Sequence, residues 1–149
     1  MILRGGFDGK CSKSLGLNVQ KVLDYLNKAK IFYVTTVDEN VPKCRPFGYA
    51  KEYDGKIYFV TGTFKEIYKQ LMANPKIEIC ASTGNTFLRY YGDAVFVDDE
   101  NISETALNDM PYLRKVYNDE TGKKLKAFYI GSGTVEIRSA FDIKESFEL

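Results

Sequence analysis

The two apolar runs on either side of Asp54-Gly55 constrain the fold of this chain more than any other feature. Asp-Gly is typical of a two-residue turn with positive φ angles, so the pair predicts a tight β-hairpin. Residues 57–60, just after the turn, are all apolar, which indicates a strand covered on both faces. A glycine-threonine loop follows, and then a helix over residues 64–73 that Asn74-Pro75 ends. The predicted buried face of this helix consists of Ile67, Tyr68, Leu71 and Met72.

The rest of the chain predicts hairpins with helices around them. Apolar residues at helical spacing predict a first helix that Asn18 caps and that ends near Lys30. Strands are expected over residues 31–37, 41–53, 56–61, 77–81, 87–97 and 125–138, and short helices over 102–107 and 111–117. This order favours an antiparallel sheet or small barrel with helices outside it. We find no repeat or linker and expect a single domain over residues 1–149, with residues 1–17 as a loose N-terminal arm.

Composition argues against several classes of protein. The 21 basic and 20 acidic side chains leave a net charge of +1, which does not suggest a nucleic-acid-binding protein. No apolar run approaches the ~18 residues of a membrane-spanning helix or resembles a signal sequence, so we expect a cytoplasmic protein without a membrane partner. Cys11, Cys44 and Cys80 lack metal-binding spacing, so we expect no metal site and interpret them as small hydrophobic residues.

The absence of histidine limits the chemistry further. It removes histidine-based nucleophiles, histidine-ligated metals and the commonest general base. Any reaction is therefore expected to belong to a bound cofactor.

The loop after the third strand has the features of a phosphate site. Thr61 and Thr63 carry hydroxyl donors, and Lys65 adds a charge beside a helix start, where free N–H groups attract anions. If the strands pair about the Asp54-Gly55 turn, Arg45 lies opposite the far end of the third strand, near Lys65. Two cations that converge there favour a bound phosphate, which Arg45 can hold through two donors.

Each of these residues also has a simpler interpretation. Lys65 can be a solvated surface lysine, and Arg45 can pair with Glu78 or Asp93 on the surface. Gln70 falls nearly opposite the apolar face on a helical projection, so it is left out of the site.

A flat ring can approach the backbone just after Arg45. Pro46 and Gly48 predict a bend there, although Phe47 can instead be a core residue beside an edge-strand bulge. Tyr90 and Tyr91, next to Arg89, can line a cavity, but aromatic residues at strand spacing are more often core.

These segments resemble the pyridoxamine 5′-phosphate oxidase-like family of FMN-binding split barrels, and in length and motif style its nitroimidazole-resistance reductase branch. The resemblance rests on VLDYL in the first helix, RPFG at residues 45–48 and TGTFKEIYKQLMANP at residues 61–75. It implies a mainly β fold with flanking helices, a six-stranded antiparallel split β-barrel, and a homodimer with FMN at the subunit interface. In such proteins the cofactor is bound by residues that match Arg45, Pro46, Phe47, Gly48, Val60, Thr61, Thr63, Lys65 and, for the partner's flavin, Arg89.

The resemblance implies an FMN-dependent oxidoreductase that reduces a small aromatic, nitroaromatic or quinone-like acceptor. It does not extend to pyridoxamine phosphate oxidation, because Glu66 and Ile67 stand where the oxidases carry two basic residues. Catalytic residues stay unassigned, with Tyr90 or Tyr91 only a guess for a proton donor. A non-enzymatic flavin-binding or ligand-sensing protein on the same fold is the alternative, and a deazaflavin or haem in the same groove is a third hypothesis.

Overall fold

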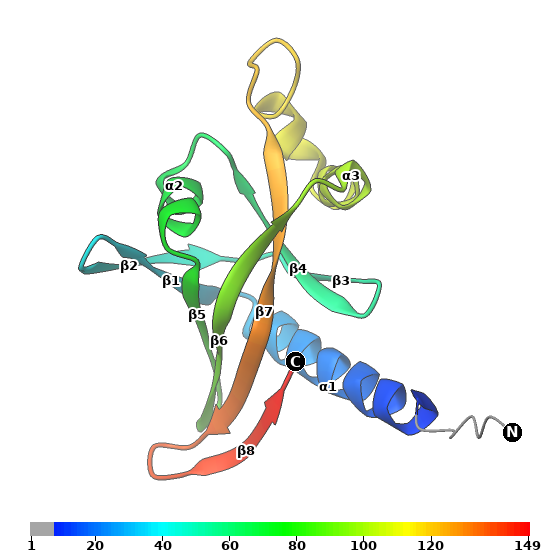
Figure 1. The fold of residues 1–149 in the computed structure, drawn as a ribbon, viewed down its shortest axis with the longest axis vertical. Helices are drawn as coiled ribbons and strands as arrows, with labels where there is room; N and C mark the ends of the chain where they lie inside the picture. The colour runs from blue at the N-terminus through cyan, green and yellow to red at the C-terminus, as the bar shows by residue number, and fades with distance from the viewer. Residues whose placement is uncertain (1–7) are drawn as a thin grey trace, which may run out of the picture.

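A computed structural model describes the chain from Asp8 to Leu149 as an antiparallel sheet flanked by helices (Figure 1). Eight strands form the sheet in the order β2-β1-β5-β6-β7-β4-β3, with β8 paired to β7. The strands are β1 (Phe32–Asp38), β2 (Val41–Phe47), β3 (Lys51–Tyr53), β4 (Lys56–Gly62), β5 (Lys76–Thr83), β6 (Thr86–Val97), β7 (Leu125–Arg138) and β8 (Ile143–Glu148). The helices are α1 (Asp8–Ala29), α2 (Glu66–Ala73), α3 (Glu100–Asp109) and the short 3₁₀ helix η1 (Pro111–Lys115). The expected mainly β class is confirmed.

The long strand β7 links the two halves of the sheet. Its first residues pair with β4, its last residues pair with β8, and β6 runs along nearly its whole length. Because β4 meets the rest of the sheet only through β7, this 14-residue strand closes the barrel.

The structure has eight strands where six were expected. The single strand predicted over residues 41–53 is divided in two, because the chain leaves the sheet at Gly48–Ala50 and changes partner. β2 pairs with β1, whereas β3 pairs with β4 about the predicted Asp54-Gly55 turn. Pro42 and Pro46 lack an N–H donor, which explains why β2 is the outermost strand of the sheet. The end of the chain supplies the eighth strand, β8, for which the sequence made no prediction.

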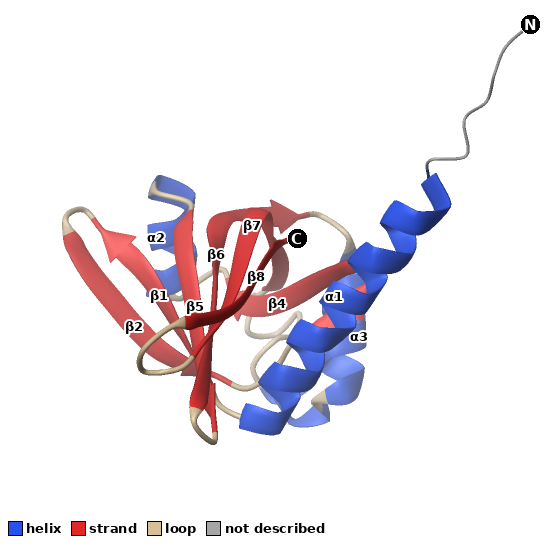
Figure 2. Ribbon diagram, turned by 90° about the horizontal axis from the view of Figure 1, so that it is seen from below, coloured by secondary structure: helices blue, strands red, loops and turns tan. Residues whose placement is uncertain are grey.

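The first helix starts earlier than predicted. α1 has 22 residues and begins at Asp8. The prediction of a loose arm is therefore wrong for residues 8–17, and Asn18 lies inside the helix and does not cap it. Residues 1–7 of the predicted arm lie outside the described residues. Glycine disfavours a helix by about 1 kcal/mol, and Gly9 and Gly16 hid this extension in the sequence. The early turns of α1 project beyond the barrel (Figure 2).

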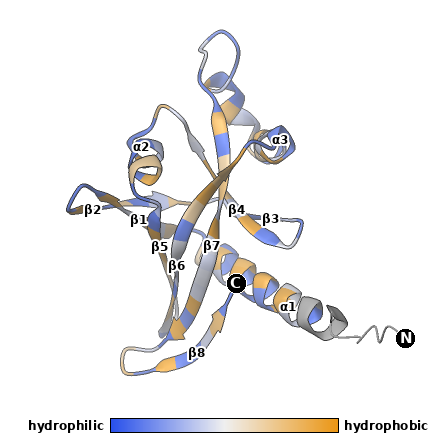
Figure 3. Ribbon diagram, in the orientation of Figure 1, coloured by the Kyte–Doolittle hydropathy of each residue, from blue (hydrophilic) through white to orange (hydrophobic). Residues whose placement is uncertain are grey.

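The core lies between α1 and the concave face of the sheet. Side chains less than 2% exposed come from α1, β1, β4, β5, β6 and β7, and include Val22, Leu26, Phe32, Val34, Phe59, Ile79, Leu88, Phe128 and Val135. Burying each such side chain contributes about 1.5–3 kcal/mol. Hydrophilic and hydrophobic segments alternate along the helices and strands, as expected for elements with one buried face (Figure 3). Within residues 8–149, no helix is long and apolar enough to cross a membrane.

Candidate functional site

Arg45 lies against α2 and is held by neutral oxygen atoms. Its Nη1 donates to Thr36 Oγ1 at 2.7 Å, and its Nη2 donates to Gln70 Oε1 at 2.7 Å. Thr36 also donates to Gln70 Oε1 at 2.6 Å, which closes the triad of Arg45, Thr36 and Gln70. No carboxylate of the described residues forms an ion pair with Arg45. Partial burial lowers the pKa of Arg45, which the nearby Cys44 offsets in part, and its positive charge is left without an anion.

The position of Gln70 corrects the sequence analysis. Gln70 is only 8% exposed and lies on the buried face of α2 with Ile67 and Leu71, whereas Met72 is 60% exposed. Buried polar groups need hydrogen-bond partners, and Arg45 and Thr36 satisfy this one. The alternation of β1 was the available signal, since Thr36 shares its buried face with Val34.

The predicted route from Arg45 to the helix is also wrong. Pairing about the Asp54-Gly55 turn extends only over β3 and the start of β4, while Arg45 stands opposite Val34 of β1. Arg45 reaches α2 instead because α2 packs on β1. Its suggested surface partners are engaged elsewhere, since Glu78 pairs with Arg89 and Asp93 pairs with Lys76.

α2 begins with a lysine and without a side-chain cap. Lys65 occupies the N-cap position in an extended conformation and is exposed, and no described carboxylate pairs with it. Glu66 in the first turn pairs with Lys69 at 2.9 Å. A cation at this end opposes the helix dipole, so the free N–H groups and Lys65 together favour an anion. Gln70, which binds Arg45, lies five residues after Lys65 on α2. This spacing corresponds to about 7.5 Å of helical rise.

The loop before α2 is held by a distant part of the chain. Thr61 is 3% exposed, and its Oγ1 is buried without a hydrogen-bond partner among the described residues. A Cβ at Gly62 would lie 2.6 Å from the hydroxyl of Tyr117, so any larger residue there would force the Tyr117 side chain to move. The N–H of Thr63 donates to the carbonyl of Lys124 at 3.0 Å. The segment from Tyr117 to Lys124 therefore fixes the loop, a contact that no sequence pattern indicated.

The bend after Arg45 is anchored on both sides. Phe47 packs on Phe32, with ring centroids 6.3 Å apart, while Pro46 and Gly48 are exposed. Tyr49 donates to Asp109 Oδ2 at 2.8 Å and ties the bend to α3. The hydrogen bond from Tyr49, with a second from Lys51, lowers the pKa of Asp109. Val60, the remaining residue expected near a ring, is half-buried against the small cluster of Tyr58, Ile102 and Ala127.

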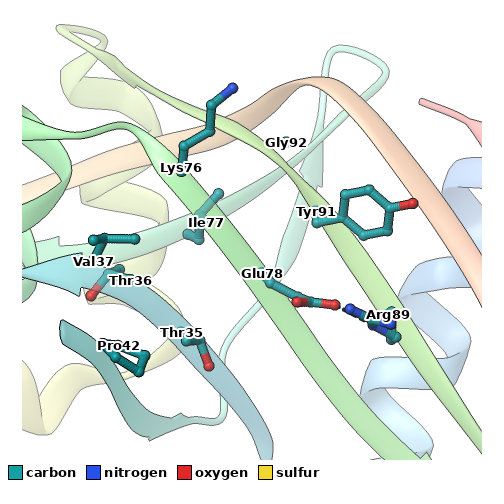
Figure 4. Close-up of a pocket in the computed structure, with 10 residues that line it drawn as sticks. All are labelled: Thr35, Thr36, Val37, Pro42, Lys76, Ile77, Glu78, Arg89, Tyr91 and Gly92. Atoms are coloured by element: carbon teal, nitrogen blue, oxygen red, sulfur yellow. Dashed lines mark hydrogen bonds and ion pairs between the residues drawn. The ribbon is translucent and has the colours of Figure 1, made fainter. Parts of the chain in front are cut away.

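Arg89 lies on the opposite face of the sheet from Arg45. Figure 4 shows it paired with Glu78 beside Tyr91, in a hollow of about 350 Å³ across β1, β5 and β6. Its guanidinium carbon is 5.9 Å from the Tyr91 ring centroid. The hydrogen bond to Glu78 raises the pKa of Arg89. Within one described chain, Arg89 is therefore separate from Arg45, Thr61, Thr63 and Lys65.

Cys44 and Cys80, which were interpreted as small hydrophobic residues, are free and exposed on this open face. Cys44 stands opposite Thr35 and Cys80 opposite Tyr33, so β1 separates them by two strand spacings, about 9–10 Å. This distance is too long for a disulfide within the chain. Burial raises the pKa of the Cys80 thiol, to which Glu78 adds. The side chain of Cys11 lies outside the described residues.

Solved structures share this fold over most of the chain. A NimC/NimA family protein from Clostridium acetobutylicum is 29% identical, with a TM-score of 0.81 over 95% of this chain and 99% of that one. A putative pyridoxamine 5′-phosphate oxidase from Listeria innocua is 18% identical, with a TM-score of 0.58 over 89% and 98%. An FAD-binding protein from Mesorhizobium loti is 12% identical, with a TM-score of 0.55 over 83% and 94%. No curated protein matches the chain.

The sequence match to a family covers most of the barrel. The family described as pyridoxamine 5′-phosphate oxidase matches residues 19–137, from the buried face of α1 to the end of β7. This region contains Arg45, Thr61 and Lys65, together with the α2 helix that joins them. The protein therefore belongs to the pyridoxamine 5′-phosphate oxidase family.

Proposed function

We propose that this protein is a single-domain, cytoplasmic FMN-dependent oxidoreductase that acts as a homodimer and reduces a small aromatic, nitroaromatic or quinone-like acceptor. The observation that carries the proposal is Arg45, a part-buried cation that neutral oxygens hold beside a helix that begins with Lys65, and neither cation pairs with a carboxylate among residues 13–149. The 29% identity to a NimC/NimA family protein supports this branch, and the FAD-binding relative supports a flavin on this fold.

The residues present fit a flavin phosphate. Arg45 and Lys65 supply two positive charges without carboxylate partners among residues 13–149, and the uncapped start of α2 supplies backbone donors. Thr61 has a buried hydroxyl without a partner, and Thr63 adds a second hydroxyl. Pro46, Phe47, Gly48 and Val60 would flank the ring. Arg89 would approach the flavin of the partner subunit, which agrees with its position on the other face of the sheet.

When bound, FMN supplies hydride and single-electron transfer. The chain would bind and orient it. Thr36 and Gln70 hold the Arg45 guanidinium in one orientation, which lowers the conformational cost of binding a phosphate. The Gly62 loop stays fixed under Phe64 and Tyr117, so Lys65 is presented from a rigid position.

One observation favours the alternative of a non-enzymatic flavin-binding or ligand-sensing protein. All groups assigned to the cofactor are hydrogen-bond donors or apolar neighbours, and none is an acid or base poised near neutral pH. Such a protein would bind FMN equally well and would transfer no electrons to an acceptor.

An absorbance spectrum of the purified protein, followed by denaturation and identification of the released molecule, tests the cofactor. We expect a flavin spectrum and about one FMN per chain, whereas a haem or deazaflavin spectrum would identify the third hypothesis. Stopped-flow mixing of the loaded protein with NADH or NADPH then tests for an enzyme, because a binding module would not be reduced. A protein that binds no added FMN would overturn the proposal.

A further inference from the structure

A second cavity lies on the far side of the barrel from α2. Its volume is about 420 Å³, within the range of small-molecule sites. α1, the β3–β4 hairpin, β6 and β7 contribute its walls, which are mostly apolar and include Leu15, Val19, Ile57, Tyr90, Tyr129 and Ile130. None of the residues assigned to the flavin lines it. We name it the Tyr90 cavity.

The Tyr90 hydroxyl is a polar group in the cavity wall that could form a hydrogen bond with a ligand. Tyr90 is only 2% exposed, and its hydroxyl forms no hydrogen bond with any described residue. Unlike the Thr61 Oγ1 atom, the Tyr90 hydroxyl is not among the described polar atoms that are both sealed from solvent and without a hydrogen bond. Tyr90 lines the cavity, which places this hydroxyl-bearing ring at its wall. Burial alone raises the pKa of Tyr90, so the hydroxyl stays a neutral donor.

The backbone beside Tyr90 is shaped to keep the ring in place. A Cβ at Gly133 would lie 2.7 Å from Tyr90 Cε2, so the ring lies directly against a glycine backbone. The β6–β7 register shifts between Tyr91 and Asp93, and Ser132, which lines the cavity, has a φ of 51°. Bulges and left-handed non-glycine residues cost energy and cluster at binding sites. This irregular segment lies beside the Tyr90 ring at the cavity wall, which also carries the hydroxyls of Tyr129 and Ser132.

The walls also indicate the kind of ligand. Tyr90 and Tyr129 supply aromatic surface, and Val19, Ile57 and Ile130 supply aliphatic surface. The Lys56 ammonium lies over the Tyr129 ring, 5.5 Å from its centroid, at the hairpin that borders the cavity. Because no described residue accepts a hydrogen bond from the Tyr90 hydroxyl, a ligand oxygen can act as its acceptor. We propose that the Tyr90 cavity binds a small, uncharged aromatic molecule through a carbonyl oxygen that accepts the Tyr90 hydroxyl proton in a hydrogen bond, at a site separate from the flavin.

A matched pair of probes tests the proposal by fluorescence titration of the whole protein. 2-Acetylnaphthalene carries the acceptor oxygen, and 2-ethylnaphthalene has nearly the same shape without it. We expect the ketone to bind more tightly. Tyr90→Phe should weaken ketone binding about three- to tenfold, the net effect of one neutral hydrogen bond, and leave 2-ethylnaphthalene binding unchanged. Since the hydroxyl forms no hydrogen bond with residues 13–149, the thermal midpoint of Tyr90→Phe should not fall.

Leu15 and Leu17 provide a control for location. Leu15 lines the cavity, whereas Leu17 is 72% exposed on the same helix and does not. Leu15→Asp should weaken the binding of both probes, whereas Leu17→Asp should leave the binding of both unchanged. Saturating FMN should leave probe binding unchanged. The proposal is overturned if wild type binds neither probe, if Tyr90→Phe weakens both equally, or if FMN displaces the ketone. A protein that binds the ketone but no FMN would refute only the flavin proposal.

Discussion

Replacing Gln70 with methionine tests whether the triad of Arg45, Thr36 and Gln70 is a stabilising part of the fold. Methionine keeps the length of the side chain and removes the acceptor. In the native protein, Gln70 Oε1 accepts from Arg45 at 2.7 Å and from Thr36 at 2.6 Å. Both donors would lose a partner in Gln70→Met, at a position only 8% exposed.

The expected loss follows from these two bonds. A hydrogen bond to a charged group contributes about 1.5–3 kcal/mol, and a neutral one about 0.5–1.5 kcal/mol. Arg45 is only half-buried and can turn to water, so solvent recovers part of its contribution. We therefore expect Gln70→Met to lower the free energy of unfolding by about 1–2 kcal/mol, or the thermal midpoint by about 2–8 °C for a chain of this size.

Urea unfolding followed by circular dichroism measures the effect. Gln20→Met is the matched control, because Gln20 is exposed and bonds only Asp24, so it should change stability by less than about 0.5 kcal/mol. Combining Gln70→Met with Arg45→Met should cost less than the sum of the single changes, by about 0.5 kcal/mol or more. Strict additivity, or a Gln70→Met protein as stable as the control, would refute this account of the triad.

Three further outcomes are expected. Lys65→Ala removes one charge-assisted hydrogen bond and should weaken FMN binding by about ten- to a hundredfold in a fluorescence titration. Lys69 is already paired with Glu66, so Lys69→Ala should bind FMN as wild type does. Gly62→Ala should destabilise the fold by about 1–3 kcal/mol in urea unfolding, and adding Tyr117→Phe, which removes the closest clashing atom, should recover part of the loss; no recovery would contradict the contact. Asp109 has a lowered pKa, so its contribution is present at neutral pH and is lost as the pH falls from about 4 through that lowered pKa. Asp109→Asn should therefore be less stable than wild type at pH 7, and the difference should shrink steadily as the pH falls below about 4.

Local patterns were sufficient for most of the strands and for the hairpin. The continuous apolar run of β4 and the Asp54-Gly55 turn predict the observed pairing of β3 with β4. In β5, the alternation of Ile77, Ile79 and Ala81 matches the side chains that are buried. These features depend on neighbours in sequence, which is why sequence alone was enough.

The errors arose where distant parts of the chain decide the outcome. Gln70 looked solvent-facing because only its own helix was considered, whereas Arg45 from β2 makes its burial favourable. The change of partner at Gly48–Ala50 depends on α3, through the bond from Tyr49 to Asp109. The grouping of Thr63 with Lys124 joins segments some sixty residues apart, and no periodicity reports such a contact.

The place of β7 in the chain has a consequence for synthesis on the ribosome. β4 (Lys56–Gly62) is synthesised well before β7 (Leu125–Arg138), so until β7 emerges β4 is paired only with β3. The nascent chain would meanwhile expose the apolar strand Lys56–Gly62 along one open edge, the kind of surface that chaperones bind. Closure of this barrel can therefore be completed only after β7 has left the exit tunnel.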